Sequence, residues 1–82
     1  MIINVTQEDI DNGKRLRARE CPVALAIKRT TFKSFHVHPT MCWECGIDNS
    51  KVILVPSEAG RFIRTFDAHR VVKPFSFDLP ID

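Results

Sequence analysis

The spacing of hydrophobic residues changes several times along the chain, and each change marks a new element. Residues 1–5, Met-Ile-Ile-Asn-Val, form a short β-prone run. Thr6 follows as a helix N-cap with acidic residues after it, and Gly13 ends that helix early. A helix of about seven residues is not stable alone, so we expect it to pack on the core through Ile10.

Residues 21–29 indicate a second helix. Pro22 suits its first turn, and the Ala and Leu residues that follow favour helix propagation. Residues 21–27 are apolar on nearly every side, which is typical of a helix that is buried on most of its surface. We expect this segment to be the central core element, with Cys21 as a buried cap or core thiol and not a nucleophile.

A two-residue alternation of apolar and polar side chains starts at Phe35. His36 and His38 occupy the polar positions, as expected for a strand with one solvated face. Two further β-prone runs follow, separated by a turn at residues 48–50. We expect an antiparallel meander formed by residues 35–39, 41–47 and 51–55.

A third helix is predicted after Pro56, with Ser57 as its N-cap. Apolar residues recur along it at helical spacing, while Arg61 and Arg64 face outward. Residues 74–80 alternate between prolines and suit an edge strand or a tail that crosses the core. The core residues expected from the two main helices are Ala24, Leu25, Ile27, Phe62, Ile63 and Phe66.

These elements predict one α+β domain over residues 1–82, in the order β-α-α-β-β-β-α-β. The expected architecture is a mainly antiparallel sheet of about three to five strands. This sheet packs against two main helices and a short N-terminal helix. A chain of 82 residues is long enough to bury one such core. We expect it to fold alone or as a small homo-oligomer.

The net charge and the number of cysteines limit the binding partners and the cellular compartment that we expect. The formal net charge of +2 is too small to indicate a nucleic-acid binder by itself. Three cysteines cannot all pair internally, and an odd number in a short chain fits a reducing compartment. No run approaches the roughly 18 apolar residues of a membrane span, and residues 1–5 lack the features of a secretory signal. We therefore expect a cytosolic protein that does not interact with membranes.

The sharpest candidate for chemistry is a cluster of potential zinc ligands, His36, His38, Cys42 and Cys45. A strong zinc signature has two separated ligand pairs, whereas Cys42 and Cys45 in an extended strand would point to opposite faces. A redox pair would need the first thiol at a helix N-terminus, which this segment does not offer. We expect exposed histidines, packed or partly exposed thiols and no cofactor, and retain a zinc-stabilised module as an alternative.

The sequence contains no recognisable catalytic motif. It has no G-x-S-x-G, no H-E-x-x-H and no glycine-rich phosphate loop. Triples of Ser, His and Asp can be drawn in any small protein, and the spacing here favours none of them. We therefore expect a protein that is not an enzyme.

Two basic segments are candidates for contact with nucleic acid. The first is an exposed linking run that contains Lys14, Arg15, Arg17 and Arg19. The second runs along and after the third helix, with Arg61, Arg64, Arg70 and Lys73. Acidic residues interrupt both segments, and solvated cations are common in loops and on helix faces. Direct nucleic-acid binding through these residues is therefore an alternative function.

Trp43 and Met41 are candidate contacts for a protein partner, together with His36 and His38. Tryptophan is enriched in binding hot spots. In a strand that alternates apolar with polar residues, the favoured interpretation of Trp43 is a core residue. If Trp43 is exposed beside Met41, the two would form an interaction patch.

Residues 5–13, 21–26, 62–67 and 74–80 together resemble a group of small uncharacterised bacteriophage and prophage proteins. The resemblance does not extend to residues 32–49. It implies a non-enzymatic accessory protein that binds a host macromolecule, as inhibitors of bacterial defence systems such as anti-CRISPR proteins do. On this basis we expect stoichiometric binding to a host protein or protein–nucleic acid complex. The expected contacts lie in residues 36–47 or on the Arg61 and Arg64 face.

Overall fold

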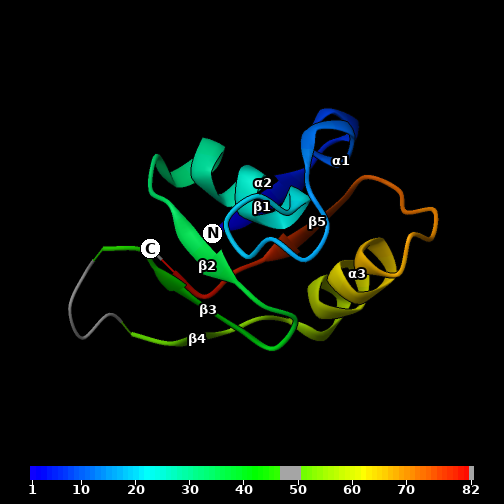
Figure 1. Ribbon diagram of the computed structural model, residues 1–82. Coiled ribbons are helices and arrows are strands. Elements are labelled where there is room, and N and C mark those ends of the chain that lie inside the picture. Colours follow the sequence, from blue (N-terminus) through cyan, green and yellow to red (C-terminus); the bar gives the residue numbers. More distant parts are fainter. Residues whose placement is uncertain (47–50, 82) are drawn as a thin grey trace.

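The computed structural model describes residues 1–46 and 51–81 (Figure 1). Its elements are β1 (Ile2–Val5), α1 (Gln7–Asn12), α2 (Pro22–Thr31), β2 (Phe35–Val37), β3 (Met41–Glu44), β4 (Ile53–Leu54), α3 (Ser57–Asp67) and β5 (Phe75–Asp78). This succession confirms the predicted α+β class and order of elements. Within the described residues, no helix has the length and apolar character needed to cross a membrane.

The strands form two antiparallel sheets where a single sheet was expected. β1 pairs with β5, with Ile3 opposite Phe77, so the two ends of the chain lie side by side (Figure 1). The second sheet has the strand order β2-β3-β4, which confirms the predicted meander. Its strands are shorter than predicted, because β3 ends in a turn where Gly46 adopts a φ of 76°. Residues 47–50 of the predicted strand and turn lie outside the described residues.

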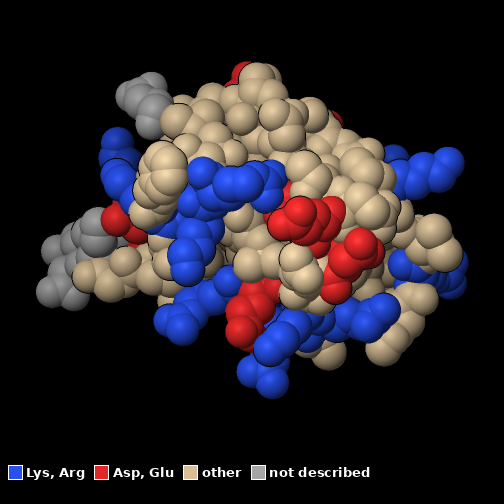
Figure 2. Space-filling model, turned by 90° about the horizontal axis from the view of Figure 1, so that it is seen from above, with Lys and Arg blue, Asp and Glu red and all other residues tan. Residues whose placement is uncertain are grey.

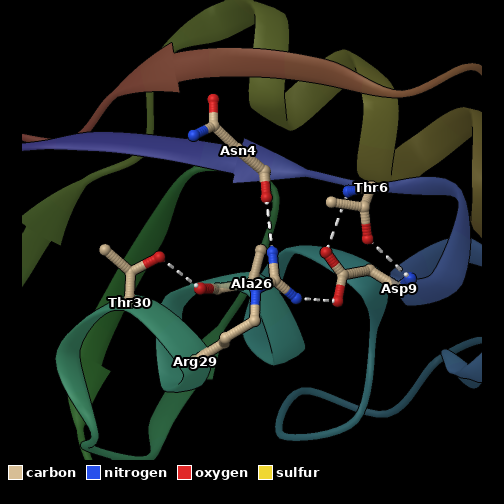
Figure 3. A network of polar contacts seen from close by, with 6 residues as sticks. All are labelled: Asn4, Thr6, Asp9, Ala26, Arg29 and Thr30. Atoms are coloured by element: carbon tan, nitrogen blue, oxygen red, sulfur yellow. Dashed lines mark hydrogen bonds and ion pairs between the residues drawn. The ribbon is translucent and has the colours of Figure 1, made fainter.

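Thr6 caps α1 as predicted, in a reciprocal arrangement with Asp9. The Thr6 hydroxyl accepts a hydrogen bond from the Asp9 N–H (3.2 Å), and the Asp9 carboxylate accepts one from the Thr6 N–H (2.9 Å). Arg29 of α2 also donates to Asp9, and its second nitrogen donates to the Asn4 carbonyl of β1 at 2.7 Å. Figure 3 shows how these contacts join β1, α1 and α2.

Cys21 caps α2, as its sulfur accepts a hydrogen bond from the Ala24 N–H at 3.4 Å. Burial raises the pKa of the Cys21 thiol, although hydrogen bonds from backbone N–H groups oppose this effect. The expectation of a buried cap is confirmed. Leu25, expected in the core, is only half-buried. The buried side of α2 is centred between Val23 and Ile27, and Leu25 lies on the opposite side of the helix.

Ser57 is not the N-cap of α3, contrary to prediction. Pro56 is the N-cap residue, with φ −56° and ψ 149°, and no side chain caps the helix. The Pro56 carbonyl already accepts a hydrogen bond from the Gly60 N–H at 3.0 Å, so Ser57 is inside the first turn. The predicted apolar stripe is confirmed: Ala59, Phe62, Ile63 and Phe66 are buried.

The core is continuous between the two sheets and the two longer helices. α2 packs on β1, and Ile3, Val5 and Phe77 belong to the same core as the buried side of α2. The three-stranded sheet and α3 contribute the other buried side chains, which include Phe35, Val37, Cys42, Phe62 and Phe66. One face of the three-stranded sheet is therefore committed to folding.

We predict that Asp9→Asn lowers the free energy of unfolding by about 1–3 kcal/mol, because charge-assisted hydrogen bonds to a buried group are lost. Burial alone would raise the pKa of Asp9, but hydrogen bonds from Arg29 and Thr6 prevail and hold it below 3.8. The folded pKa is thus lower than the unfolded one. The carboxylate therefore stabilises the fold fully above about pH 4, and this contribution is lost as pH falls through the folded pKa.

Urea denaturation at several pH values measures this effect. The difference between the wild-type protein and Asp9→Asn should be largest near neutral pH and shrink below about pH 4. Glu8→Gln, which removes the same charge from an exposed position of α1, is the control and should change stability much less. A difference that stays constant down to pH 2 would contradict the assignment.

Phe32, the C-cap residue of α2, provides a second test of the fold. It adopts the left-handed conformation (φ 61°, ψ 21°) and is 91% exposed. Glycine adopts this conformation without steric cost, and little packing is lost with the phenyl ring. We predict that Phe32→Gly raises the free energy of unfolding by about 0.5–1 kcal/mol in urea denaturation. Phe32→Ala removes the same ring but keeps Cβ, and should give little or no gain.

Candidate functional site

The β2-β3-β4 sheet presents one face to the core and the other outward. Val37 and Cys42 are directly opposite each other and both are buried. Because successive residues of a strand point to opposite faces, the neighbouring pair His36 and Trp43 points away from the core. Met41 and Leu54, which are also opposite each other, share this side. We call the side chains of His36, His38, Met41, Trp43 and Leu54 the outer face.

Two histidines pack against Trp43 on the outer face. The ring of His38 stacks on the indole with a centroid distance of 5.1 Å and an interplanar angle of 21°. His36 lies at 5.5 Å and 31°. Trp43 is therefore half-buried beneath the two histidines and is not one of the core residues. The prediction that favoured Trp43 as a core residue was wrong. The physical reason is the strand register, which gives the inward position to Cys42.

The outer face also exposes aliphatic side chains. Met41 is exposed, as the interaction-patch hypothesis requires, and Leu54 beside it is 74% exposed. Val52, just before β4, is exposed as well. Sequence reasoning missed Leu54 and Val52, because residues 52–55 are all apolar and show no alternation that would assign a face. Only the pairing of Leu54 with Met41 reveals it.

A loop between α1 and α2, residues 14–20, covers the free edge of β2; we call it the connector (Figure 1). Its two ends are joined by a hydrogen bond from the Lys14 N–H to the Glu20 carbonyl (2.8 Å). Its middle is joined to β2 by a bond from the Val37 N–H to the Ala18 carbonyl (2.8 Å). The basic run is thus exposed, as predicted, but it is a fixed loop with its own contacts.

Contacts with α3 also hold the connector. The Arg15 Nε donates to the Phe66 carbonyl at 3.2 Å, and the guanidinium lies 5.2 Å from the centroid of the Phe66 ring. The next N–H, that of Leu16, donates to the Asp67 carboxylate at 3.0 Å. Arg15 therefore anchors the loop and is a poor candidate for contact with nucleic acid.

The other cations of the connector differ in their surroundings. The Lys14 ammonium lies 3.8 Å from the Glu20 carboxylate, so its charge is partly balanced. Arg17 and Arg19 are exposed and form no ion pair with an acidic side chain of residues 1–46 or 51–81. Of the four cations of the connector, these two are the most available for contact with nucleic acid.

Two adjacent hollows join the connector to the outer face. One, of about 490 Å³, is lined by Arg17 and Arg19 together with His36. The other, of about 310 Å³, is lined by Arg17 and His38 and ends at α3. Both include Leu16 and Ala18, and we call the two hollows the connector groove. The structure thus brings together residues that the sequence had assigned to two different functions.

Arg61 and Arg64 are exposed on α3, as predicted. Gly60 packs tightly against the turn between β2 and β3: a Cβ at this position would lie 2.3 Å from the Pro39 carbonyl oxygen and 3.8 Å from the Arg64 guanidinium. Arg64 therefore lies near the β2–β3 turn. Arg61 shows no such contact within the described part of the chain.

The structure does not assemble the predicted zinc ligands. Cys42 is buried on the inner side of β3, whereas His36 and His38 lie on the outer face. Cys45 follows β3, and its N–H donates to the Ser34 carbonyl at 2.8 Å. Burial raises the pKa of Cys42 to about 11, which disfavours the thiolate that zinc would need. Among the described residues, no three His, Cys, Asp or Glu side chains are placed to hold a metal ion.

Comparisons with protein-family models, with curated proteins and with solved structures find no match for this chain. The resemblance of its ends to phage proteins therefore stays a prediction. The function is therefore argued from the outer face, on β2, β3 and β4, and from the connector groove, beside the loop that precedes α2.

Proposed function

We propose that this protein is a non-enzymatic binding protein that docks to a protein partner through its outer face and thereby inhibits or modulates it. The observation behind the proposal is the exposure of Met41 and Leu54 next to the stacked rings of His36, Trp43 and His38.

The composition of the outer face supports protein binding. Along the strands of an antiparallel sheet, the positions that face solvent usually carry polar residues. In this sheet, aliphatic and aromatic side chains occupy several of the outward positions. Contiguous exposed apolar surface with a polar border is typical of protein interaction sites. Arginine and tryptophan, which are enriched in hot spots, occur together here, with Arg17 beside the histidines.

The phage-like ends of the chain suggest which partner to seek. They favour a bacterial macromolecule, and a defence complex that processes nucleic acid is the candidate we put first. This choice depends on the resemblance, whereas the choice of the outer face depends on its exposed residues.

We predict that Leu54→Asp abolishes capture of the partner from bacterial lysate, because a charge would replace the most exposed apolar side chain of the outer face. The immobilised protein and the variant are compared by quantitative mass spectrometry, and the captured protein is then purified for direct titration. Val71→Asp, at a 92% exposed position between α3 and β5, is the matched control and should leave capture unchanged. A partner retained by Leu54→Asp at full strength would contradict the proposal.

A second candidate is direct nucleic-acid binding by Arg17 and Arg19, favoured by their exposure beside His36 in one hollow. On the face shown in Figure 2, however, Lys and Arg lie beside Asp and Glu and form no continuous basic surface. A protein partner is therefore the better supported of the two.

Nucleic-acid binding predicts a salt-sensitive mobility shift of labelled DNA or RNA. The shift should weaken about tenfold or more when both Arg17 and Arg19 are changed to Ser, since each phosphate contact contributes to the salt-dependent affinity. Lys51→Ser, which removes a cation from an exposed position before β4, is the control. Absence of any shift at low salt would exclude this candidate.

A further inference from the structure

Leu16 is unusual in both its backbone conformation and the exposure of its side chain. It adopts the left-handed conformation with φ 58°, which is unfavourable for a residue with a branched side chain, and it is 82% exposed. Glycine or asparagine would adopt this conformation more easily. The hydrogen bond from its N–H to Asp67 fixes the conformation from outside the loop. Phe32 shares both features, so what distinguishes Leu16 is its place in the two hollows.

The position of Leu16 in the connector groove points to a role in binding. Its side chain lines both hollows of the connector groove, together with Arg17 and Ala18. The smaller hollow is mainly apolar, with Val37, Pro39 and Ile63 in its wall. The groove therefore combines an apolar floor with guanidinium groups at its border.

We propose that the connector groove binds a short segment of a protein partner in which an apolar side chain is flanked by Asp or Glu. The apolar side chain packs against Leu16 in the smaller hollow, and the carboxylates pair with Arg17 and Arg19. This proposal rests on the proposed function, since both need a protein partner, and it names the chemistry of the segment that is recognised.

The acidic residues of the proposed segment are inferred from the positive charges of Arg17 and Arg19. Two carboxylates also line the groove: Asp67, which accepts the Leu16 N–H, and Glu20, whose charge Lys14 partly balances. Arg17 and Arg19 form no ion pair with the described acidic side chains. Guanidinium groups bind carboxylates with good geometry and strength. An acidic segment is therefore complementary to this border.

The apolar wall distinguishes a protein segment from nucleic acid. A phosphodiester backbone needs clustered cations and gains nothing from an exposed leucine. Base stacking needs an open aromatic ring, and His36 and His38 pack against Trp43 and leave it half-buried. An apolar side chain, in contrast, gains affinity from each CH₂ group buried against Leu16.

The test uses a random library of 12-residue peptides displayed on a carrier and selected on the immobilised protein. We expect enrichment of peptides with one large apolar residue flanked by Asp or Glu. The strongest peptide is then synthesised with a fluorophore, and its Kd is measured by anisotropy for the wild-type protein and its variants.

Leu16→Asn keeps a residue suited to the left-handed conformation and should weaken binding about tenfold or more, with no loss of stability in urea. The double change of Arg17 and Arg19 to Ser should weaken it to a similar extent and remove its dependence on salt. Phe32→Asn is the matched control. It changes another left-handed and exposed apolar residue, at the end of α2, and should leave the Kd unchanged.

Three results would overturn the groove proposal: no enrichment of acidic–apolar peptides, a Kd unchanged by Leu16→Asn, or an equal loss of affinity with Phe32→Asn. Labelled DNA or RNA that competes with the peptide and still binds Leu16→Asn fully would assign the groove to nucleic acid instead. Failure here is distinguishable from failure of the outer-face proposal. Leu54→Asp abolishes lysate capture if the outer face docks a partner, whatever the peptides do.

Discussion

The arrangement of β1, α1 and α2 depends on one buried carboxylate, that of Asp9. Among the described residues, Asp9 alone combines a charge with burial, at 4% exposure. Its hydrogen bonds cap α1, and its ion pair with Arg29 joins α1 to α2 while the same guanidinium holds the carbonyl of Asn4 in β1. A buried carboxylate without such partners would be strongly unfavourable. β1 also pairs with β5 from the other end of the chain. The contacts of Asp9 therefore position both termini and the central helix together.

The residues of the proposed docking site lie outside this group of contacts. β1, β5 and α2 form the frame, and the β2-β3-β4 sheet packs on it through one face only. The inner positions of that sheet, such as Val37 and Cys42, complete the core. Its outer positions, such as His36 and Trp43, point away from the core and form the proposed docking face. The connector covers the edge of β2 that would otherwise be open to a strand of another chain.

The sequence predicted local features well and tertiary ones poorly. The order of elements, the Thr6 cap and the Cys21 cap follow from neighbouring residues, and the structure confirms them. The division into two sheets depends on pairing between distant strands, which no local pattern encodes. For the same reason Trp43 was assigned to the core and Leu54 was missed as an exposed residue. The candidate ligands failed as a zinc set because strand alternation places Cys42 and the histidines on opposite faces.

If the connector binds a partner as proposed, it does so without a large entropic cost on association. Ordering a mobile loop opposes binding, but this loop is already held at its ends, at β2 and at α3. The unfavourable conformation of Leu16 is supported by Asp67 and, through Arg15, by Phe66 of the core. Folding energy from α3 thus maintains a loop shape that the local sequence alone would not choose. Leu16 and Arg17 are in this way held at the groove before any partner arrives, which favours slow dissociation of a complementary segment.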